Sequence, residues 1–266
     1  MGIAFVTKRT TLQRATLEAD ARVEHLTAVH VGTAVTSPSF SPDGRSIVFE
    51  DGFSVWKTAV DGSEARTVSP PDARWTCPAW APDSSAIVVT RRVRPGSWVL
   101  SHVELATGRT TDLLSPGPWR STPCGAYLDA GHLLLTQRDP ATHSVGIFMA
   151  GVDGLNVVPF VFLHGCNVTS PRPDPTGTQV LVAASCIDPY DDGAWAVPVA
   201  GGAPRHVLTG HVAVPVWTPG GAILFGYIAL GATQDRPSLW VAAADGSEPT
   251  TVLGLPGTWN SWPAAG

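Results

Sequence analysis

One short motif recurs six times along the chain, and this repeat constrains the fold more than any other feature of the sequence. It reads SFSPDG at residues 39–44 and VWTPGG at residues 216–221. The other copies are AWAPDS (79–84), AYLDAG (126–131), RPDPTG (172–177) and SWPAAG (261–266). Successive copies begin 40 to 47 residues apart, a period typical of chains built from small, similar structural units.

Each unit is predicted to contain four short antiparallel strands. Apolar runs such as SIVFE (46–50) follow the first five copies and have the composition of buried strands. A second marker, such as VDGSE (60–64) or ADGSE (244–248), recurs in phase, and its Asp-Gly pair suits the positive φ angles of a tight hairpin. One strand precedes this hairpin and one follows it, so we expect strands a to d in every unit.

Four-stranded units at this period are typical of β-propeller blades, which favours an all-β, six-bladed propeller. The sixth copy has no apolar run after it, but the chain begins with MGIAFVT, which has the missing pattern. We therefore expect one domain over residues 1–266, whose last blade joins residues 261–266, as strand a, to residues 1–30, as strands b to d. The other blades are predicted at residues 37–70, 77–116, 124–162, 170–209 and 214–254.

The segments SFSPDGRSIVFE (39–50) and VWKTAVDGSEARTVS (55–69) resemble the WD40-like, or PD40, repeat of TolB-like six-bladed β-propellers. The resemblance covers nearly the whole chain and weakens at AYLDAG and RPDPTG, where the Ser-Pro-Asp-Gly turn is degraded. It implies a fold, because the repeated residues are turn and core residues. Proteins of this fold include partner-binding scaffolds, substrate gates of peptidases, and lyases of pectin fragments with metal-binding histidines, so the resemblance does not choose a function.

Composition and charge exclude several classes of function. A net charge of −5 gives no general attraction to nucleic acid, and no apolar run is long enough to span a membrane. No nucleophile elbow of a serine hydrolase, nucleotide-binding loop or dinucleotide-binding glycine motif is present. The N-terminal MGIAFVTKRTTLQ lacks the apolar core of a signal peptide, which favours a cytoplasmic protein over an exported one, and we expect a monomer.

The four cysteines form no Cys-x-x-Cys pair, so a zinc ribbon is not expected. Cys77 and Cys124 hold equivalent positions in neighbouring blades. We interpret them as small buried thiols, with a reactive pair as the alternative.

The turns from a to b and from c to d are short and uniform, whereas the connections from d to a and from b to c vary in every blade. These irregular connections lie at one end of the propeller, where we expect binding. Each d-to-a connection carries one large aromatic or imidazole group. The predicted ligand-binding residues there are His30, Trp75, Trp119 and Trp259, joined by Arg91 and Tyr190 from b-to-c connections.

The first functional hypothesis is a rigid scaffold that binds a small molecule, a glycan or a protein segment at the mouth of its central channel. The alternative is a lyase, isomerase or cyclase in which His164 and His211 act as acid and base while Arg172 polarises a carboxylate or carbonyl. No cofactor is expected in the first case. A divalent metal held by His30, His164 and His211 is possible in the second. A purely structural reading, in which Trp plugs the channel and His caps loop carbonyls, stays open.

Overall fold

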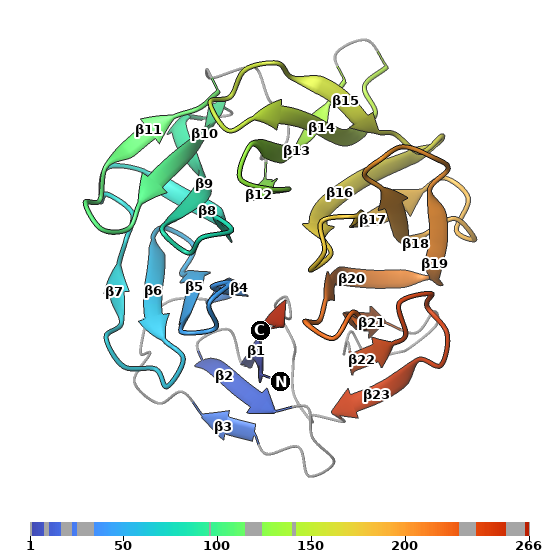
Figure 1. Ribbon diagram of the computed structural model, residues 1–266, viewed down its shortest axis with the longest axis horizontal. Helices are drawn as coiled ribbons and strands as arrows, with labels where there is room; N and C mark the ends of the chain where they lie inside the picture. The colour runs from blue at the N-terminus through green and yellow to red at the C-terminus, as the bar shows by residue number, and fades with distance from the viewer. Residues whose placement is uncertain are drawn as a thin grey trace.

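The structure is a computed structural model, and it describes residues 2–7, 11–16, 23–25, 35–95, 97–114, 124–139, 142–228, 238–253 and 264–265. The secondary structure of these residues consists of β-strands. Across these ranges we find no helix with the length and apolar character needed to cross a bilayer. The strands form six four-stranded sheets within the described residues, and the sheets stand around a central channel (Figure 1). The predicted all-β propeller fold is confirmed.

Five of the sheets are formed by strands that follow one another along the chain. The first two contain β4 (Thr36–Phe40), β5 (Ser46–Glu50), β6 (Val55–Ala59) and β7 (Arg66–Thr67), then β8 (Arg74–Trp80), β9 (Ala86–Arg94), β10 (Ser97–Glu104) and β11 (Thr110–Asp112). The next two contain β12 (Gly125–Tyr127), β13 (His132–Arg138), β14 (Val145–Gly151) and β15 (Val158–Val161), then β16 (Cys166–Pro173), β17 (Gln179–Cys186), β18 (Gly193–Pro198) and β19 (Arg205–Thr209). The fifth contains β20 (His211–Trp217), β21 (Ile223–Ile228), β22 (Ser238–Ala242) and β23 (Thr250–Leu253). We call these sheets blades 1 to 5.

The remaining sheet is assembled from both ends of the chain, in the order β24 (Ala264–Ala265), β1 (Gly2–Thr7), β2 (Thr11–Thr16) and β3 (Val23–His25). Ile3 pairs with Ala265 and Ala4 with Ala264, so the C-terminal strand lies beside the N-terminal one. Figure 1 shows the two termini close together near the channel. This sheet lies between blade 5 and blade 1, and its inner strands contact β4 and β20.

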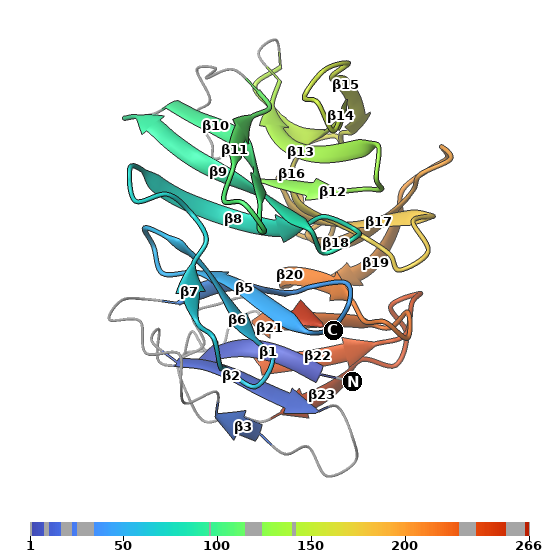
Figure 2. The same ribbon diagram turned by 60° about the vertical axis from the view of Figure 1, so that its left-hand side comes forward.

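The core lies between neighbouring sheets. Between blades 1 and 2, Val48 packs with Trp80 and Ile87, and these side chains are 0%, 7% and 0% exposed. Similar clusters join blades 3 and 4 and blades 4 and 5. Figure 2, turned by 60°, shows the sheets stacked face to face around the ring. Each fully buried Val, Ile or Leu contributes about 1.5 to 3 kcal/mol, so the apolar runs after each motif supply the main stabilisation of the ring.

The aspartates of the repeated turns act as caps for backbone N–H groups. Asp43 accepts hydrogen bonds from the Ser41 hydroxyl and the Arg45 N–H, which lower its pKa below the ordinary 3.8. Hydrogen bonds from the Ser85 N–H and hydroxyl likewise lower the pKa of Asp83. These interactions explain why Asp recurs in the motif, since an ionised carboxylate at this position closes the turn.

The pKa values of these aspartates are lower in the folded protein than in the unfolded chain. The turns are therefore expected to stabilise the protein at pH values above the unfolded-state pKa, and to lose this stabilisation as the pH falls through the folded-state pKa. The urea midpoint should therefore drop between about pH 5 and about pH 3. The double variant Asp43→Asn, Asp83→Asn should show a shallower drop than the parent. An equally steep drop in both proteins would contradict this role of the two turns.

Candidate functional site

Four of the innermost strands carry the same bulge beside a proline. The register shifts between Thr36 and Ser39 in β4, and equivalent shifts occur in β8, β16 and β20. The residues before the prolines have positive φ angles, namely Ser37 (52°), Cys77 (55°), Ser170 (56°) and Val214 (30°). Proline has no N–H to donate and is tolerated in a sheet at an edge strand or a bulge. A bulge bends the strand and re-aims its side chains, and all four of these residues line a cavity in the central channel.

This channel cavity has a volume of about 390 Å³, within the size range of small-molecule sites. Its wall is formed mainly by the inner strands of blades 1, 2, 4 and 5. Hydroxyl groups are provided by Ser37, Ser39, Thr76 and Ser170. The charged residues of its lining are Glu50 and Arg172.

Glu50 is the last residue of β5 and is 7% exposed. Its Oε1 accepts hydrogen bonds from the Thr36 hydroxyl at 2.9 Å and the Ser37 hydroxyl at 2.8 Å. Its Oε2 accepts the Cys77 N–H at 3.1 Å. The carboxylate therefore links the inner strands of blades 1 and 2 and brings a negative charge to the cavity wall.

Arg172 lies on β16 just after the bulge and contributes to the same wall. Its Nη1 donates to the Pro171 carbonyl oxygen at 3.0 Å, whereas a guanidinium group has five N–H donors. No carboxylate of the described residues forms an ion pair with it, and burial lowers the pKa of Arg172. The side chain is partly accessible through the cavity, so its remaining donors are available to a bound molecule.

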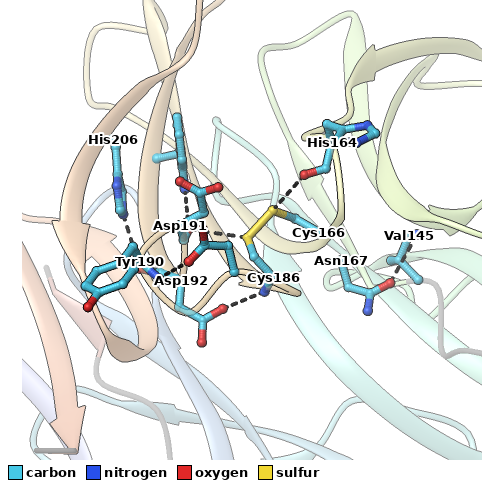
Figure 3. Close-up of a disulfide and its surroundings, with 11 residues drawn as sticks. Val145, His164, Cys166, Asn167, Cys186, Tyr190, Asp191, Asp192 and His206 are labelled. Atoms are coloured by element: carbon cyan, nitrogen blue, oxygen red, sulfur yellow. Dashed lines mark hydrogen bonds between the residues drawn. A yellow bond between two sulfur atoms is a disulfide. The ribbon is translucent and has the colours of Figure 1, made fainter.

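All four cysteines form disulfides, which corrects the interpretation of Cys77 and Cys124 as buried thiols. Cys77 and Cys124 join the inner regions of blades 2 and 3, and both line the channel cavity. Cys166 and Cys186 join β16 to β17 in blade 4 (Figure 3). Equivalent positions of adjacent inner strands lie side by side, which is why the first pair can form.

A side pocket of about 300 Å³ adjoins the channel cavity and shares Ser170 and Val214 with it. His211, the exposed first residue of β20, lies in its wall. So does Asp192, which is 7% exposed and accepts the Cys186 N–H through Oδ1. An imidazole and a carboxylate thus line one pocket, which is a combination that acid–base chemistry can use.

No family model and no curated protein sequence matches this chain, and its similarities are to solved structures. TolB from Acinetobacter baumannii superposes with a TM-score of 0.82 at 15% identity, over 99% of this chain and 66% of that one. This chain has a TolB-like β-propeller fold. At this level of identity the similarity shows the fold alone.

Two enzymes have the same kind of TolB-like propeller architecture. An oligogalacturonate lyase in complex with manganese superposes with a TM-score of 0.63 at 14% identity, over 90% of this chain and 69% of that one. A gluconolactonase from Xanthomonas campestris superposes with a TM-score of 0.64 at 15% identity, over 98% of this chain and 87% of that one. The TolB-like fold therefore occurs in enzymes.

Trp75 and Arg91, predicted at the mouth of the TolB-like propeller, lie together within blade 2. The Trp75 ring is 1% exposed and belongs to the core between blades 1 and 2. The Arg91 guanidinium lies 5.6 Å from the centre of this ring and forms a 2.6 Å ion pair with Asp112. Trp75 is therefore covered and does not form a wall of the channel cavity.

Two of the other predicted residues lie in exposed connections of the chain. His164 is exposed in the turn before β16, and Tyr190 is 80% exposed in the connection after β17. His30, Trp119 and Trp259 lie outside the described residues. The described residues bring no three His, Cys, Asp or Glu side chains together as a metal site, and the proposed set of His30, His164 and His211 stays a prediction.

Glu50 was missed by the sequence analysis, although the repeat contains a signal for it. The equivalent positions in blades 2 to 5 hold Thr90, Thr136, Ala183 and Gly226. A carboxylate at this position is therefore unusual among the repeats of this TolB-like propeller. The same comparison had identified Arg172, whose equivalents are Ser39, Ala79, Ala126 and Val216.

Proposed function

We propose that the protein binds a small, hydroxyl-rich anion in the channel cavity, with Arg172 as the anchor of its carboxylate. The guanidinium of Arg172, half-buried in the cavity wall and without a carboxylate partner among the described residues, is the observation that carries this proposal. A charge in such a place is incompletely solvated, and a bound anion supplies the missing partner. Arg is suited to the task because its planar donors match the two oxygens of a carboxylate.

The rest of the wall supports a sugar acid as the ligand class. Glu50 and the hydroxyls of Ser37, Ser39 and Ser170 offer acceptors and donors for sugar hydroxyls. Two proteins of the same architecture, an oligogalacturonate lyase and a gluconolactonase, take their names from sugar-acid compounds. Binding needs only these fixed groups, so a scaffold function is the first choice.

Replacing Arg172 by Met is expected to weaken this binding by at least about 30-fold, because charge-assisted hydrogen bonds are lost. The free energy of unfolding without ligand should stay unchanged or rise, since a half-buried charge without a carboxylate partner is replaced by an apolar side chain of similar length. Calorimetric titration with galacturonate and gluconate measures the affinity, and galactose is the probe without a carboxylate.

Two results would contradict the proposal. One is that neither acid binds more tightly than galactose. The other is that Arg172→Met binds them as the parent does. Arg91→Met is the matched control. Because Arg91 is already paired with Asp112, its replacement should leave the affinity for the two acids unchanged.

An enzyme of lyase, isomerase or cyclase type is the second candidate, and the side pocket favours it. His211 and Asp192 line a pocket that opens beside the proposed anion site. Incubating the protein with oligogalacturonate or with gluconolactone tests this candidate. Turnover that is lost in His211→Ala but kept in His164→Ala would support an acid–base role for His211.

The two disulfides also bear on the compartment. Disulfides persist in oxidising surroundings and are rare in the cytosol. In place of the expected cytoplasmic location we therefore propose an exported protein, and mass spectrometry of alkylated protein from each cell fraction tests this. Recovery of the protein in the cytoplasmic fraction, with all four cysteines alkylated, would contradict it.

A further inference from the structure

A buried carboxylate, Asp192, lines the side pocket that adjoins the channel cavity. Asp192 is 7% exposed and directly precedes β18. Because alternate residues of a strand share a face, its side chain points to the same side of blade 4 as Ala194, which belongs to the core between blades 4 and 5. The opposite wall of the pocket comes from Gly210, His211 and Val212, at the start of blade 5. Asp192 therefore brings a negative charge into a pocket between the two blades.

The Asp192 carboxylate has one hydrogen-bond donor among the residues that the structure describes. Its Oδ1 accepts the Cys186 N–H (Figure 3), and no such partner is found for Oδ2 within the same residues. The two oxygens of a carboxylate can accept about four hydrogen bonds. Asp174, on the same blade, is a satisfied carboxylate, since it accepts two N–H groups and two hydroxyls from nearby residues. Oδ2 of Asp192 is thus left to accept from a molecule in the side pocket.

No lysine or arginine of the described part of the chain pairs with Asp192. From residue 139 to residue 228 the sequence contains two such residues, Arg172 and Arg205. Arg172 lines the channel cavity, and Arg205 donates to two backbone carbonyl oxygens of blade 5. His211 lies in the wall of the same pocket, but the ion pairs of the described residues do not join it to Asp192. A buried carboxylate without a cationic partner favours a cationic ligand.

Several contacts hold Asp192 in one position. The Cys166–Cys186 disulfide ties Cys186, whose N–H binds Oδ1, to β16. The Asp192 carbonyl oxygen accepts the Gly210 N–H at 2.9 Å, and His206 Nε2 lies 3.2 Å from the same oxygen. Figure 3 shows Asp192 between Cys186 and His206. Because the carboxylate is already ordered, binding of a ligand costs little conformational entropy here.

One molecule can reach both Asp192 and the proposed anchor Arg172. The side pocket and the channel cavity share two residues of their walls. Arg172 pairs with Leu181, whereas Asp192 precedes the partner of Ala184. Ala184 is three residues from Leu181 and Asp192 lies one position beyond, so at about 3.3 Å per residue the two levels are about 13 Å apart. A molecule that contacts both charges is therefore longer than a single sugar ring.

We propose that the side pocket is a subsite for a primary ammonium group, held by Asp192, and that the ligand of the channel cavity is a zwitterionic disaccharide. This inference rests on the proposed binding of a sugar acid by Arg172. The sugar-acid ring lies with its carboxylate on Arg172, and an amino-sugar ring places its ammonium group on Oδ2 of Asp192. Thr169, Ser170 and Ser185 line the side pocket, and their hydroxyls suit those of the second ring.

A glucosaminyl-glucuronate disaccharide is the probe for this subsite. Its N-acetylated form is the matched control, because it keeps the carboxylate and loses the positive charge. Calorimetric titration of the parent protein should show at least about 10-fold tighter binding of the free amine, since acetylation removes a charge-assisted hydrogen bond to a carboxylate. Equal affinities of the parent for the two disaccharides would overturn the subsite. This comparison needs no variant, so it does not depend on the stability of any substitution.

Asp192→Asn removes the charge and keeps an oxygen that can accept the Cys186 N–H. It should weaken binding of the free amine at least about 10-fold and leave the affinity for the N-acetylated form within about 2-fold. Asp191→Asn is the matched control, because Asp191 is the exposed neighbour with the same charge, and it should change neither affinity by more than about 2-fold. Equal effects of the two variants would contradict a direct contact between Asp192 and the amine. Circular dichroism verifies that both variants are folded.

Arg172→Met separates this subsite from the anion site on which it rests. Both disaccharides carry the carboxylate, so this variant should lose affinity for both, whereas Asp192→Asn should lose it for the free amine alone. If Arg172→Met binds both as the parent does, the proposed anion site is wrong and the zwitterionic ligand with it. If Arg172→Met weakens both but the parent does not distinguish them, the anion site stands and the ammonium subsite is wrong. A parent that binds neither disaccharide would overturn both proposals.

Discussion

Replacing Cys77 and Cys124 together by Ser is expected to lower the free energy of unfolding by about 4 kcal/mol. The disulfide joins residues 47 apart in sequence and so limits the conformations of a long loop in the unfolded chain. It also holds blade 2 to blade 3 at the wall of the channel cavity. Urea denaturation of the oxidised parent and of the variant measures the difference.

The second disulfide provides the control, because it differs in loop length and in position. Cys166 and Cys186 are 20 residues apart and pair within one sheet, so their replacement by Ser should cost about 3 kcal/mol. The free energy of unfolding should thus fall further when the pair that links two blades, Cys77 and Cys124, is replaced. If the reduced parent unfolds at the same urea concentration as the oxidised parent, neither crosslink stabilises the fold as argued.

The propeller was predictable because the information is local and repeated. Each turn motif, apolar run and Asp-Gly pair predicts a hairpin. Because these features recur at a regular period, the sequence predicts that the hairpins form equivalent sheets. The pairing of β24 with β1 follows from the position at which the last repeat stops. Sequence patterns of this kind indicate the fold well, because turn and core residues are what the repeat contains.

The candidate site was predicted in part, and the reason lies in side-chain direction. Trp75 lies in β8, just after the expected connection, and its ring packs into the core between blades, where Arg91 covers it. Which face of a strand a residue occupies near an irregular connection depends on bulges, and a one-residue shift reverses it. The prolines after Ser37, Cys77, Ser170 and Val214 mark those bulges and could have revealed the channel-facing positions.

The cysteines show how one weak inference can conceal a stronger one. Cys77 and Cys124 were placed correctly at equivalent positions of neighbouring blades, which puts them within bonding distance. They were interpreted as small buried thiols, with a reactive pair as the alternative. The geometry of the ring predicts that the two cysteines can pair, because equivalent positions on adjacent inner strands are spatial neighbours.

Replacing Glu50 by Leu is expected to destabilise the protein by about 3 kcal/mol, even though it removes a buried charge. The carboxylate accepts hydrogen bonds from the Thr36 and Ser37 hydroxyls and the Cys77 N–H, and Leu leaves all three donors without this acceptor. Each unsatisfied buried donor costs about 1 to 3 kcal/mol, which exceeds the gain from removing one carboxylate that is already hydrogen-bonded. Urea denaturation of the ligand-free protein measures the loss.

The contrast with Arg172 makes this prediction specific to the hydrogen-bond network. Both residues are charged and line the same cavity, yet Glu50 has three described donors, whereas Arg172 has one described acceptor, the Pro171 carbonyl. Loss of Glu50 should therefore destabilise the fold, while Arg172→Met should preserve stability and lose ligand affinity. Thr36→Val removes one of the three donors and should cost about 1 kcal/mol. Equal stability losses for Glu50→Leu and Arg172→Met would show that charge at the cavity wall, and not the pattern of partners, determines stability here.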